Sequence, residues 1–293
     1  MPVSTGTPRD LRRILREPKL LVAPGCFDAL SARLIEALGF SAVYLGGWAL
    51  GSSLGCGEPR TNLTDMLQRS QEIRRAVSLP LVVDGDAGFG DAVHCEYTVA
   101  AAAAAGIDAI HIEDQVFPKR MHYHAGIEHI IPLPEMLAKI DVAVQTRGDG
   151  PFCIIGRTDA IKAQEGSFDE AVRRANSYLE HGVDAVMLFP QTREQVESLP
   201  RLVHGPLVYV WVAGSYPPLS TKELEDLGWR LVIYPITAVA ASFQAVEKVM
   251  RGLKQDGLPA VNAEEMTATR ARIQEVLKFE HAWEVERQTT EVS

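Results

Sequence analysis

Short apolar runs alternate with amphipathic stretches along most of this 293-residue chain. The eight runs are rich in β-branched residues and lie at residues 20–25, 42–47, 79–86, 108–114, 152–160, 184–190, 206–212 and 230–236. Each run is almost continuously apolar rather than alternating, which is typical of parallel strands that helices cover on both faces. Eight such strands, each followed by a helix, predict an α/β fold of the closed (β/α)₈ barrel (TIM barrel) type.

The stretches between the runs carry apolar residues at helical spacing and contain end signals. Thr64, Ser167 and Thr221 are expected to cap the starts of helices, and glycines are expected to follow the ends. These glycines are Gly39, Gly106, Gly182 and Gly228. The alternative architecture, an open doubly wound sheet, calls for a glycine-rich phosphate-binding turn after the first strand. The segment after residue 25 has no such turn, which favours the barrel.

The length suits one barrel, which typically takes ~250 residues. We therefore expect a single domain over residues 1–293, with the barrel at about 18–256. A charged stretch at 262–289 predicts an extra helix beyond the barrel. Its apolar positions are Ile273, Val276, Leu277, Phe279, Ala282 and Trp283. They indicate that this helix docks on another surface, such as that of a neighbouring subunit.

Composition and charge narrow the class of protein. The formal net charge is −9, so the chain offers no basic face for nucleic acid. Residues 1–19 lack the apolar core of a secretion signal, and no stretch reaches the roughly 18 apolar residues of a membrane span. The four cysteines, Cys26, Cys56, Cys95 and Cys153, are scattered without metal-type spacing. We therefore expect a cytoplasmic protein with reduced cysteines and no membrane or nucleic-acid partner.

Polar residues gather where the predicted strands end, which is the end of a (β/α)₈ barrel that carries the active site. They are Gly46, Gly47, Asp84, Asp86, His111, Glu113, Asp114, Arg157 and Asp159. Carboxylates that converge on one barrel mouth repel each other unless a cation lies among them, and an all-oxygen ligand set favours Mg²⁺ or Mn²⁺. The sequence predicts Asp84, Asp86 and Glu113 as metal ligands. The alternative is that these acids cap helices or pair with Arg157 and Lys119.

A cation beside Arg157 suits a small anionic substrate, because arginine binds a carboxylate through two parallel hydrogen bonds. The backbone N–H groups of Gly46 and Gly47 are expected to bind the same carboxylate, unless these glycines only form a turn. Clamping of this kind favours cleavage next to the carboxylate, because the metal stabilises the enolate that remains.

The segment after the fourth strand, residues 115–134, is long for a connection of this fold and is expected to form a lid. Its ionisable residues are Lys119, Arg120, His122, Tyr123, His124 and His129. Two alternatives are a solvated surface loop and a histidine metal site.

At these residues the chain resembles the isocitrate lyase/phosphoenolpyruvate mutase superfamily, in particular its methylisocitrate lyase-like members, over roughly residues 11–255. The matching segments are PGCFDALSARLIEALGF, VYLGG, VVDGDAGFG, HIEDQVFPKR, IIGRTDA and VIYPITA. The resemblance implies Mg²⁺ on Asp84, Asp86 and Glu113, with Mn²⁺ as a substitute. It also implies a substrate carboxylate on Arg157, Gly46 and Gly47, a catalytic Lys119, and a homotetramer that exchanges its last barrel helices between subunits.

The chain departs from the family pattern at residues that bear on the substrate. Family lyases carry a Lys-(Lys/Arg)-Cys-Gly-His loop whose cysteine donates a proton, whereas Met121 replaces the cysteine here, and His124 or Tyr123 is expected to donate instead. Glu58 replaces a substrate-binding aspartate. A glutamate after the sixth strand corresponds to Gln191, and an asparagine of the seventh strand corresponds to an apolar residue near Val210 or Trp211.

The resulting hypothesis is a Mg²⁺-dependent carbon–carbon lyase or decarboxylase that acts on a small 2-oxo or 2-hydroxy di- or tricarboxylate. Isocitrate, methylisocitrate and dimethylmalate lyases and oxaloacetate decarboxylases are the family activities that fit. The first alternative is an enzyme of P–C bonds, a phosphonomutase or a phosphonopyruvate hydrolase. The second is a barrel that binds a carboxylate without turning it over.

Overall fold

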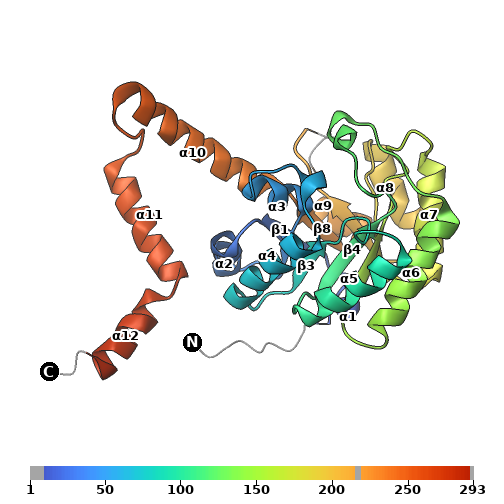
Figure 1. Ribbon diagram of the computed structural model, residues 1–293, viewed down its shortest axis with the longest axis horizontal. Coiled ribbons are helices and arrows are strands. Elements are labelled where there is room, and N and C mark those ends of the chain that lie inside the picture. The colour runs from blue at the N-terminus through green and yellow to red at the C-terminus, as the bar shows by residue number, and fades with distance from the viewer. Residues whose placement is uncertain (1–9, 215–218, 291–293) are drawn as a thin grey trace.

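The computed structural model of the chain describes residues 10–214 and 219–290, and it contains a closed barrel of eight parallel strands (Figure 1). The strands are β1 (Leu21–Cys26), β2 (Val43–Leu45), β3 (Leu81–Asp84), β4 (Ala109–Glu113), β5 (Cys153–Arg157), β6 (Ala185–Met187), β7 (Leu207–Val210) and β8 (Leu231–Tyr234). Each strand pairs with the next one along the chain, and β8 pairs with β1. The predicted (β/α)₈ barrel is confirmed.

A helix follows each strand; the first seven cover the outside of the barrel, and the helix after β8 leads away from it (Figure 1). These helices are α2 (Ala29–Ala37), α4 (Leu63–Ala76), α5 (Ala92–Ala104), α6 (Leu133–Arg147), α7 (Phe168–Glu180), α8 (Arg193–Leu202), α9 (Thr221–Leu227) and α10 (Thr237–Asp256). Two further elements, the helix α3 (Gly47–Ser53) and the 3₁₀ turn η1 (Glu58–Arg60), lie between β2 and α4. Neither of these two elements was predicted from the sequence.

Of the three residues predicted to cap helix starts, one does so and two do not. Ser167 caps α7 as expected, by accepting a hydrogen bond from the Glu170 N–H. Asn62 rather than Thr64 caps α4, and Ser220 rather than Thr221 caps α9. In both corrected cases the acidic residue three positions after the cap accepts a hydrogen bond from the backbone N–H of the cap residue. This reciprocal pairing satisfies two backbone donors and determines where the helix begins.

The barrel has two apolar layers, one inside the strands and one between strands and helices. The inner layer contains Leu21, Val82, Ile155, Val208 and Leu231. The short helix α1 (Leu11–Ile14) contributes its buried Leu11 to the same layer, as does the following Leu15, and so closes the end of the barrel where the strands begin. This helix is four residues long.

After β8 the chain leaves the barrel. Helix α10 leads away from it, and α11 (Ala263–Val276) and α12 (Phe279–Thr289) form an arm that turns back toward α2 (Figure 1). The single helix predicted over 262–289 is wrong, because the chain breaks at Lys278, whose φ is +59°. A cavity of about 550 Å³ separates α2 from α11, with Leu34 on one side and Ile273 on the other. The exchange of helices between subunits remains a prediction.

Among the described residues, no helix has both the length and the apolar character that crossing a membrane would require.

Candidate active site

The predicted polar residues meet at the mouth formed by the carboxyl ends of the strands, around a cavity of about 190 Å³. The cavity is lined by Tyr44, Gly46, Gly47, Trp48, Glu58, Asp84, Tyr123, His124, Arg157, Met187, Phe189, Val210, Val212, Ile233, Pro235 and Ile236. Seven of the residues predicted for the site lie in this lining, from the end of β2 to the end of β5.

Asp84 ends β3, and its two carboxylate oxygens accept backbone hydrogen bonds. The Asp86 N–H donates to Oδ1 at 2.9 Å, and the Gly47 N–H donates to Oδ2 at 3.0 Å. Gly46 and Gly47 do more than form a turn, because they begin α3 directly above the acid. A Cβ atom on Gly47 would lie 3.0 Å from Asp84 Oδ2 and 3.1 Å from Glu58 Cγ, so only glycine fits this close approach without displacing either acid.

Glu113, at the end of β4, lies between two cations. Its Oε1 is 2.8 Å from Lys119 Nζ and its Oε2 is 2.7 Å from an Arg157 guanidinium nitrogen. These contacts are ion pairs whose angles do not meet hydrogen-bond geometry, so both oxygens keep acceptor capacity although they are buried. Burial raises the pKa of Glu113 above its ordinary value, and the charges of Arg157 and Lys119 oppose that rise.

Lys119 links the loop to the barrel. Its Nζ donates to Glu58 at 2.8 Å and lies 3.9 Å from Asp86, in addition to its contact with Glu113. Only 5% of Lys119 is exposed. Pairing of acids with Lys119 and Arg157 was the alternative to metal ligation, and the protein makes these pairs. They neutralise part of the cluster, because Asp84, Asp86, Glu113 and Glu58 are four acids.

Arg157 ends β5 and uses much of its guanidinium within the protein. Its Nε and Nη2 donate to the two oxygens of Asp159, at 3.1 and 3.2 Å. Nη2 also lies 3.5 Å from the Tyr123 hydroxyl, and the ring of Phe189 lies 4.6 Å from the guanidinium carbon. Arg157 was expected to bind a substrate carboxylate through two parallel hydrogen bonds, but it makes these two bonds with Asp159. A ligand can contact only the edge of Arg157 that lines the cavity.

Asp114 follows Glu113 directly but points to the other side of the strand. Its carboxylate accepts hydrogen bonds from Thr158, Arg174 and Tyr178, at 2.7 to 3.0 Å, beneath α7. Successive residues of a strand alternate between its two faces, so Glu113 faces the mouth and Asp114 faces the helix layer. Asp114 is therefore a structural acid of the barrel wall.

Tyr44 is a site residue that the sequence analysis missed. It lies inside β2, and its hydroxyl is 2.8 Å from Nε2 of His111, whose Nδ1 is 3.6 Å from Asp84. Burial, partly opposed by the charge of Asp84, lowers the pKa of His111 to about 4, so this histidine is neutral at pH 7. Because Tyr44 stands in an apolar run and not at its end, only its alternation with inward-facing neighbours could have identified it.

The loop over 115–134 lies across the mouth. An isolated bridge between Gln115 and Ile130 closes its base. Its 3₁₀ turn η2 (Met121–Ala125) brings Tyr123 and His124 to the cavity, whereas Met121 lies against Gly57 beside η1. The other ionisable residues of the loop point away from the cavity, since Arg120 and His122 are exposed and His129 pairs with Glu165. The histidine metal site is therefore not formed by the described residues of this loop.

Two of the positions that depart from the family pattern lie after β6 and at the end of β7, and one of them lines the cavity. Val210 lines it, whereas Trp211 packs against Tyr234 outside the lining. Gln191 is exposed, and its side-chain amide donates to the Phe189 carbonyl at 2.7 Å.

The carboxylates at the mouth could bind a divalent cation directly through one or two of their groups, with water as the remaining ligands. Within residues 10–214 and 219–290, no three acidic, histidine or cysteine side chains converge closely enough to enclose an ion. Mg²⁺ needs fewer, because it usually keeps several water ligands and binds through one or two carboxylates. The unsatisfied, buried oxygens of Glu113 and the neighbouring Asp84 and Asp86 supply such carboxylates.

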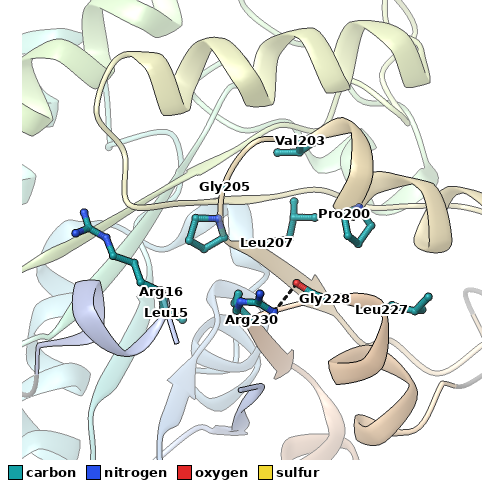
Figure 2. Close-up of a pocket in the computed structure, with 10 residues that line it drawn as sticks. Leu15, Arg16, Pro200, Val203, Gly205, Leu207, Leu227, Gly228 and Arg230 are labelled. Atoms are coloured by element: carbon teal, nitrogen blue, oxygen red, sulfur yellow. Dashed lines mark hydrogen bonds between the residues drawn. The ribbon is translucent and has the colours of Figure 1, made fainter. Parts of the chain in front are cut away.

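A second hollow, of about 400 Å³, lies at the opposite end of the barrel (Figure 2). Its walls come from the starts of β7 and β8 and from Leu15 and Arg16 after α1. Arg230 lies in its wall and donates to the carbonyl of the neighbouring Gly228 at 2.9 Å. The described residues around it include none of the predicted site residues, and active sites of this fold lie at the other end.

Fold and site define the class of protein: a (β/α)₈-barrel enzyme with an acidic, arginine-containing mouth. Residues 11–254 match the model of the phosphoenolpyruvate phosphomutase family, and the chain belongs to this family. It is 35% identical over 260 residues to a 2,3-dimethylmalate lyase of Eubacterium barkeri, covering 87% of this chain and 89% of that one. It is 36% identical over 252 residues to a 2-methylisocitrate lyase of Aeropyrum pernix, covering 84% and 80%.

The fold is similar to that of phosphonopyruvate hydrolase solved with oxalate and Mg²⁺. The TM-score is 0.81 at 31% identity, over 96% of this chain and 98% of that one. Together these relatives identify the chain as a carbon–carbon lyase of the isocitrate lyase/phosphoenolpyruvate mutase superfamily, as the resemblance predicted.

Proposed function

We propose that this enzyme is a Mg²⁺-dependent lyase that breaks a bond next to the carboxylate end of a small 2-oxo or 2-hydroxy acid. The observation that supports this most directly is the burial of four acids, Asp84, Asp86, Glu113 and Glu58, beside Arg157 at the barrel mouth. Burial of several carboxylates is costly unless cations compensate them, and Lys119 and Arg157 compensate only two. Relatives that act on 2,3-dimethylmalate and 2-methylisocitrate agree with this class of substrate.

Asp84, Asp86 and Glu113 would hold the metal ion. When bound, Mg²⁺ supplies positive charge that stabilises the negative charge developing on substrate oxygens. The exposed edge of Arg157 and the Gly46 N–H at the start of α3 would orient the carboxylate, and the Gly47 N–H holds Asp84 beside it. Mn²⁺ has the same preference for oxygen ligands and would substitute.

The residues of the loop would complete the site. Lys119 anchors the loop over the acids, and Glu58 positions Lys119 from the opposite side. Burial raises the pKa of the Tyr123 phenol above its ordinary value, although the charge of Arg157 opposes this, so the hydroxyl keeps its proton at pH 7. Tyr123 and His124 are therefore the side chains at the cavity that would donate a proton to the enolate carbon after bond cleavage.

The test is release of a 2-oxo acid from a panel that includes 2,3-dimethylmalate, 2-methylisocitrate and oxaloacetate, with products identified by mass spectrometry. We expect activity with Mg²⁺ and its loss in excess EDTA. Asp86→Ala should lower turnover by on the order of 10²–10³, the usual effect of losing an electrostatic partner of a developing anion. Asp141→Ala, which removes an exposed carboxylate on α6, is the matched control. Full activity of Asp86→Ala, or of the wild type in EDTA, would contradict the metal assignment.

Cleavage of a P–C bond is the second candidate, because the fold is similar to that of phosphonopyruvate hydrolase. Phosphonopyruvate belongs in the same panel, with inorganic phosphate as the readout. A carbon–carbon substrate is favoured because the cations that would compensate a phosphonate, Lys119 and Arg157, are already paired with acids.

A further inference from the structure

The cavity at the mouth has two chemically different halves. Strands β2 to β5 contribute its acids, its backbone N–H groups and Arg157. The residues contributed by β6, β7 and β8 and the turns after them are apolar throughout the described lining: Met187, Phe189, Val210, Val212, Ile233, Pro235 and Ile236. A ligand that fills the cavity therefore has its polar end at β2–β5 and its other end against β6–β8.

The apolar half is a continuous part of the barrel interior and not a loose surface. Met187, Val210 and Ile233 are buried and belong to the inner apolar layer, and Val212 packs against that layer. Trp48 on α3 also lines the cavity and adds to its apolar surface. A side chain or ligand that lies here exchanges water for apolar contact, which favours alkyl and aryl groups.

A second carboxylate would be poorly accommodated in that half. Among the described lining residues, Arg157 is the single permanently charged cation, and two of its nitrogens already donate to Asp159. A carboxylate placed against β6–β8 would lose its hydration without gaining a cation or a hydrogen-bond donor from those side chains. The cavity thus accepts one carboxylate at its polar end and disfavours a second at its apolar end.

We propose that the substrate is a 2-oxo acid with a single carboxylate and an uncharged apolar tail, specifically a 4-hydroxy-2-oxo acid whose alkyl or aryl end lies against β6–β8. This proposal rests on the proposed function, a lyase that generates an enolate. With one carboxylate, the 2-oxo group is the only electron acceptor in the molecule. The bond that breaks must then be the one between C3 and C4, because its electron pair can form the enolate of the 2-oxo acid.

The step balances without an oxidant or a reductant. The C4 hydroxyl gives up its proton to a base and becomes a carbonyl as the C3–C4 bond breaks. The electron pair of that bond forms the enolate, which takes up one proton at C3. The products are pyruvate and an uncharged aldehyde or ketone. His124 and Tyr123 are the residues of the loop after β4 that line the cavity, and they are the groups that would act on the C4 hydroxyl and on C3.

The decisive experiment compares two substrates that differ in one end group. In 4-hydroxy-2-oxohexanoate the tail ends in a methyl group, and in 4-hydroxy-2-oxoadipate a carboxylate replaces it. We expect kcat/KM of pyruvate release by the wild-type enzyme with Mg²⁺ to be at least about 100-fold higher for the hexanoate. In an apolar pocket, a single methylene group changes kcat/KM by up to ~200-fold. Burial of an unpaired charge in such a pocket should have an effect of at least this order.

A binding measurement keeps the test independent of turnover. 2-Oxohexanoate and 2-oxoadipate lack the C4 hydroxyl and cannot be cleaved in this way, so their dissociation constants, followed by the fluorescence of Trp48, report the pocket alone. The hexanoate should bind more tightly. Val212→Arg places a cation on the apolar wall and should reverse both preferences by at least about tenfold, since a partner for the second carboxylate then exists. Val93→Arg, on an exposed residue of α5, should leave them unchanged.

The outcomes distinguish the single-carboxylate substrate from the proposed lyase function. Preference for the adipate, or efficient cleavage of 2-methylisocitrate with no turnover of the hexanoate, would overturn the single-carboxylate proposal and leave the proposed lyase intact. Absence of any metal-dependent product from all these acids would overturn the proposed function itself. If Val212→Arg fails to fold, the wild-type comparison of the two substrates still decides the matter.

Discussion

The Lys119 ammonium nitrogen lies 2.8 Å from Oε1 of Glu113, at the centre of the barrel mouth. One residue ends a barrel strand and the other belongs to the loop that crosses the mouth, so this ion pair ties the loop to the catalytic end of the sheet. Glu58 holds the same ammonium at 2.8 Å from a third element. The pair is buried, and it therefore responds to any change in the charge of the mouth.

The first prediction concerns this ammonium. Lys119→Met should leave Glu113, Glu58 and Asp86 without their shared cation and lower the free energy of unfolding by on the order of 3–5 kcal/mol, as is usual when one partner of a buried ion pair is removed. Added Mg²⁺ should restore part of that loss, because it replaces the missing charge. Thermal unfolding in EDTA and in Mg²⁺ measures both effects.

Lys222→Met on α9 is the control for Lys119→Met, because its ion pair with Asp226 is exposed and screened by water, so its loss should leave the melting temperature nearly unchanged. Equal melting temperatures of Lys119→Met and the wild type in EDTA would show that Lys119 does not compensate the buried acids.

A second prediction separates the two neighbouring acids of β4. Asp114→Ala should destabilise the protein by on the order of 3–5 kcal/mol, because it removes the buried partner of Arg174, which keeps only Glu170, and the acceptor for Tyr178. It should not change the concentration of Mg²⁺ needed for half-maximal activity, since Asp114 faces α7. Urea unfolding and a Mg²⁺ titration of activity check this. A large change in Mg²⁺ dependence without a change in stability would instead make Asp114 a member of the site.

Arg157 is the subject of the third prediction. Arg157→Lys should raise KM and lower kcat together, because lysine cannot donate to Asp159 through two parallel bonds and also present an edge to the substrate. The measurement is steady-state kinetics on the substrate that the panel identifies. Unchanged kinetic constants would mean that Arg157 serves only as the ion-pair partner of Glu113 and Asp159.

The fourth prediction is the quaternary structure. Phe243, Val246 and Met250 form an apolar row on α10 that remains exposed in a single chain. We expect this row to be buried in a homotetramer, with a mass in light scattering of four times the 32.1 kDa chain. Phe243→Glu should shift the enzyme to smaller species, whereas Val93→Glu, equally exposed on α5, should not. A monomeric wild type would contradict the expected assembly.

The strands could be predicted from the sequence, because parallel barrel strands are buried on both faces and read as continuous apolar runs. The gathering of Asp84, Glu113 and Arg157 followed from their places at strand ends. Which way each side chain points did not follow: Asp114 was grouped with Glu113, and alternation sends it to the opposite face. Tyr44 was hidden inside an apolar run. The contacts of Lys119 depend on the path of a long loop, which local sequence does not determine.

The last prediction concerns that loop. Tyr123 and His124 line the cavity, and Met121 lies against Gly57 at its rim. Met121 cannot transfer a proton, so Met121→Ala should change KM modestly by loosening the packing of the loop. Tyr123→Phe or His124→Ala should lower kcat by the ~10²–10⁴-fold typical of a lost general acid or base, with the Mg²⁺ dependence of activity unchanged. A substitution that affects only the closure of the loop would raise KM more than it lowers kcat. Near-wild-type kcat in both the Tyr123 and the His124 variants would mean that neither side chain moves the proton and that the loop acts only as a cover.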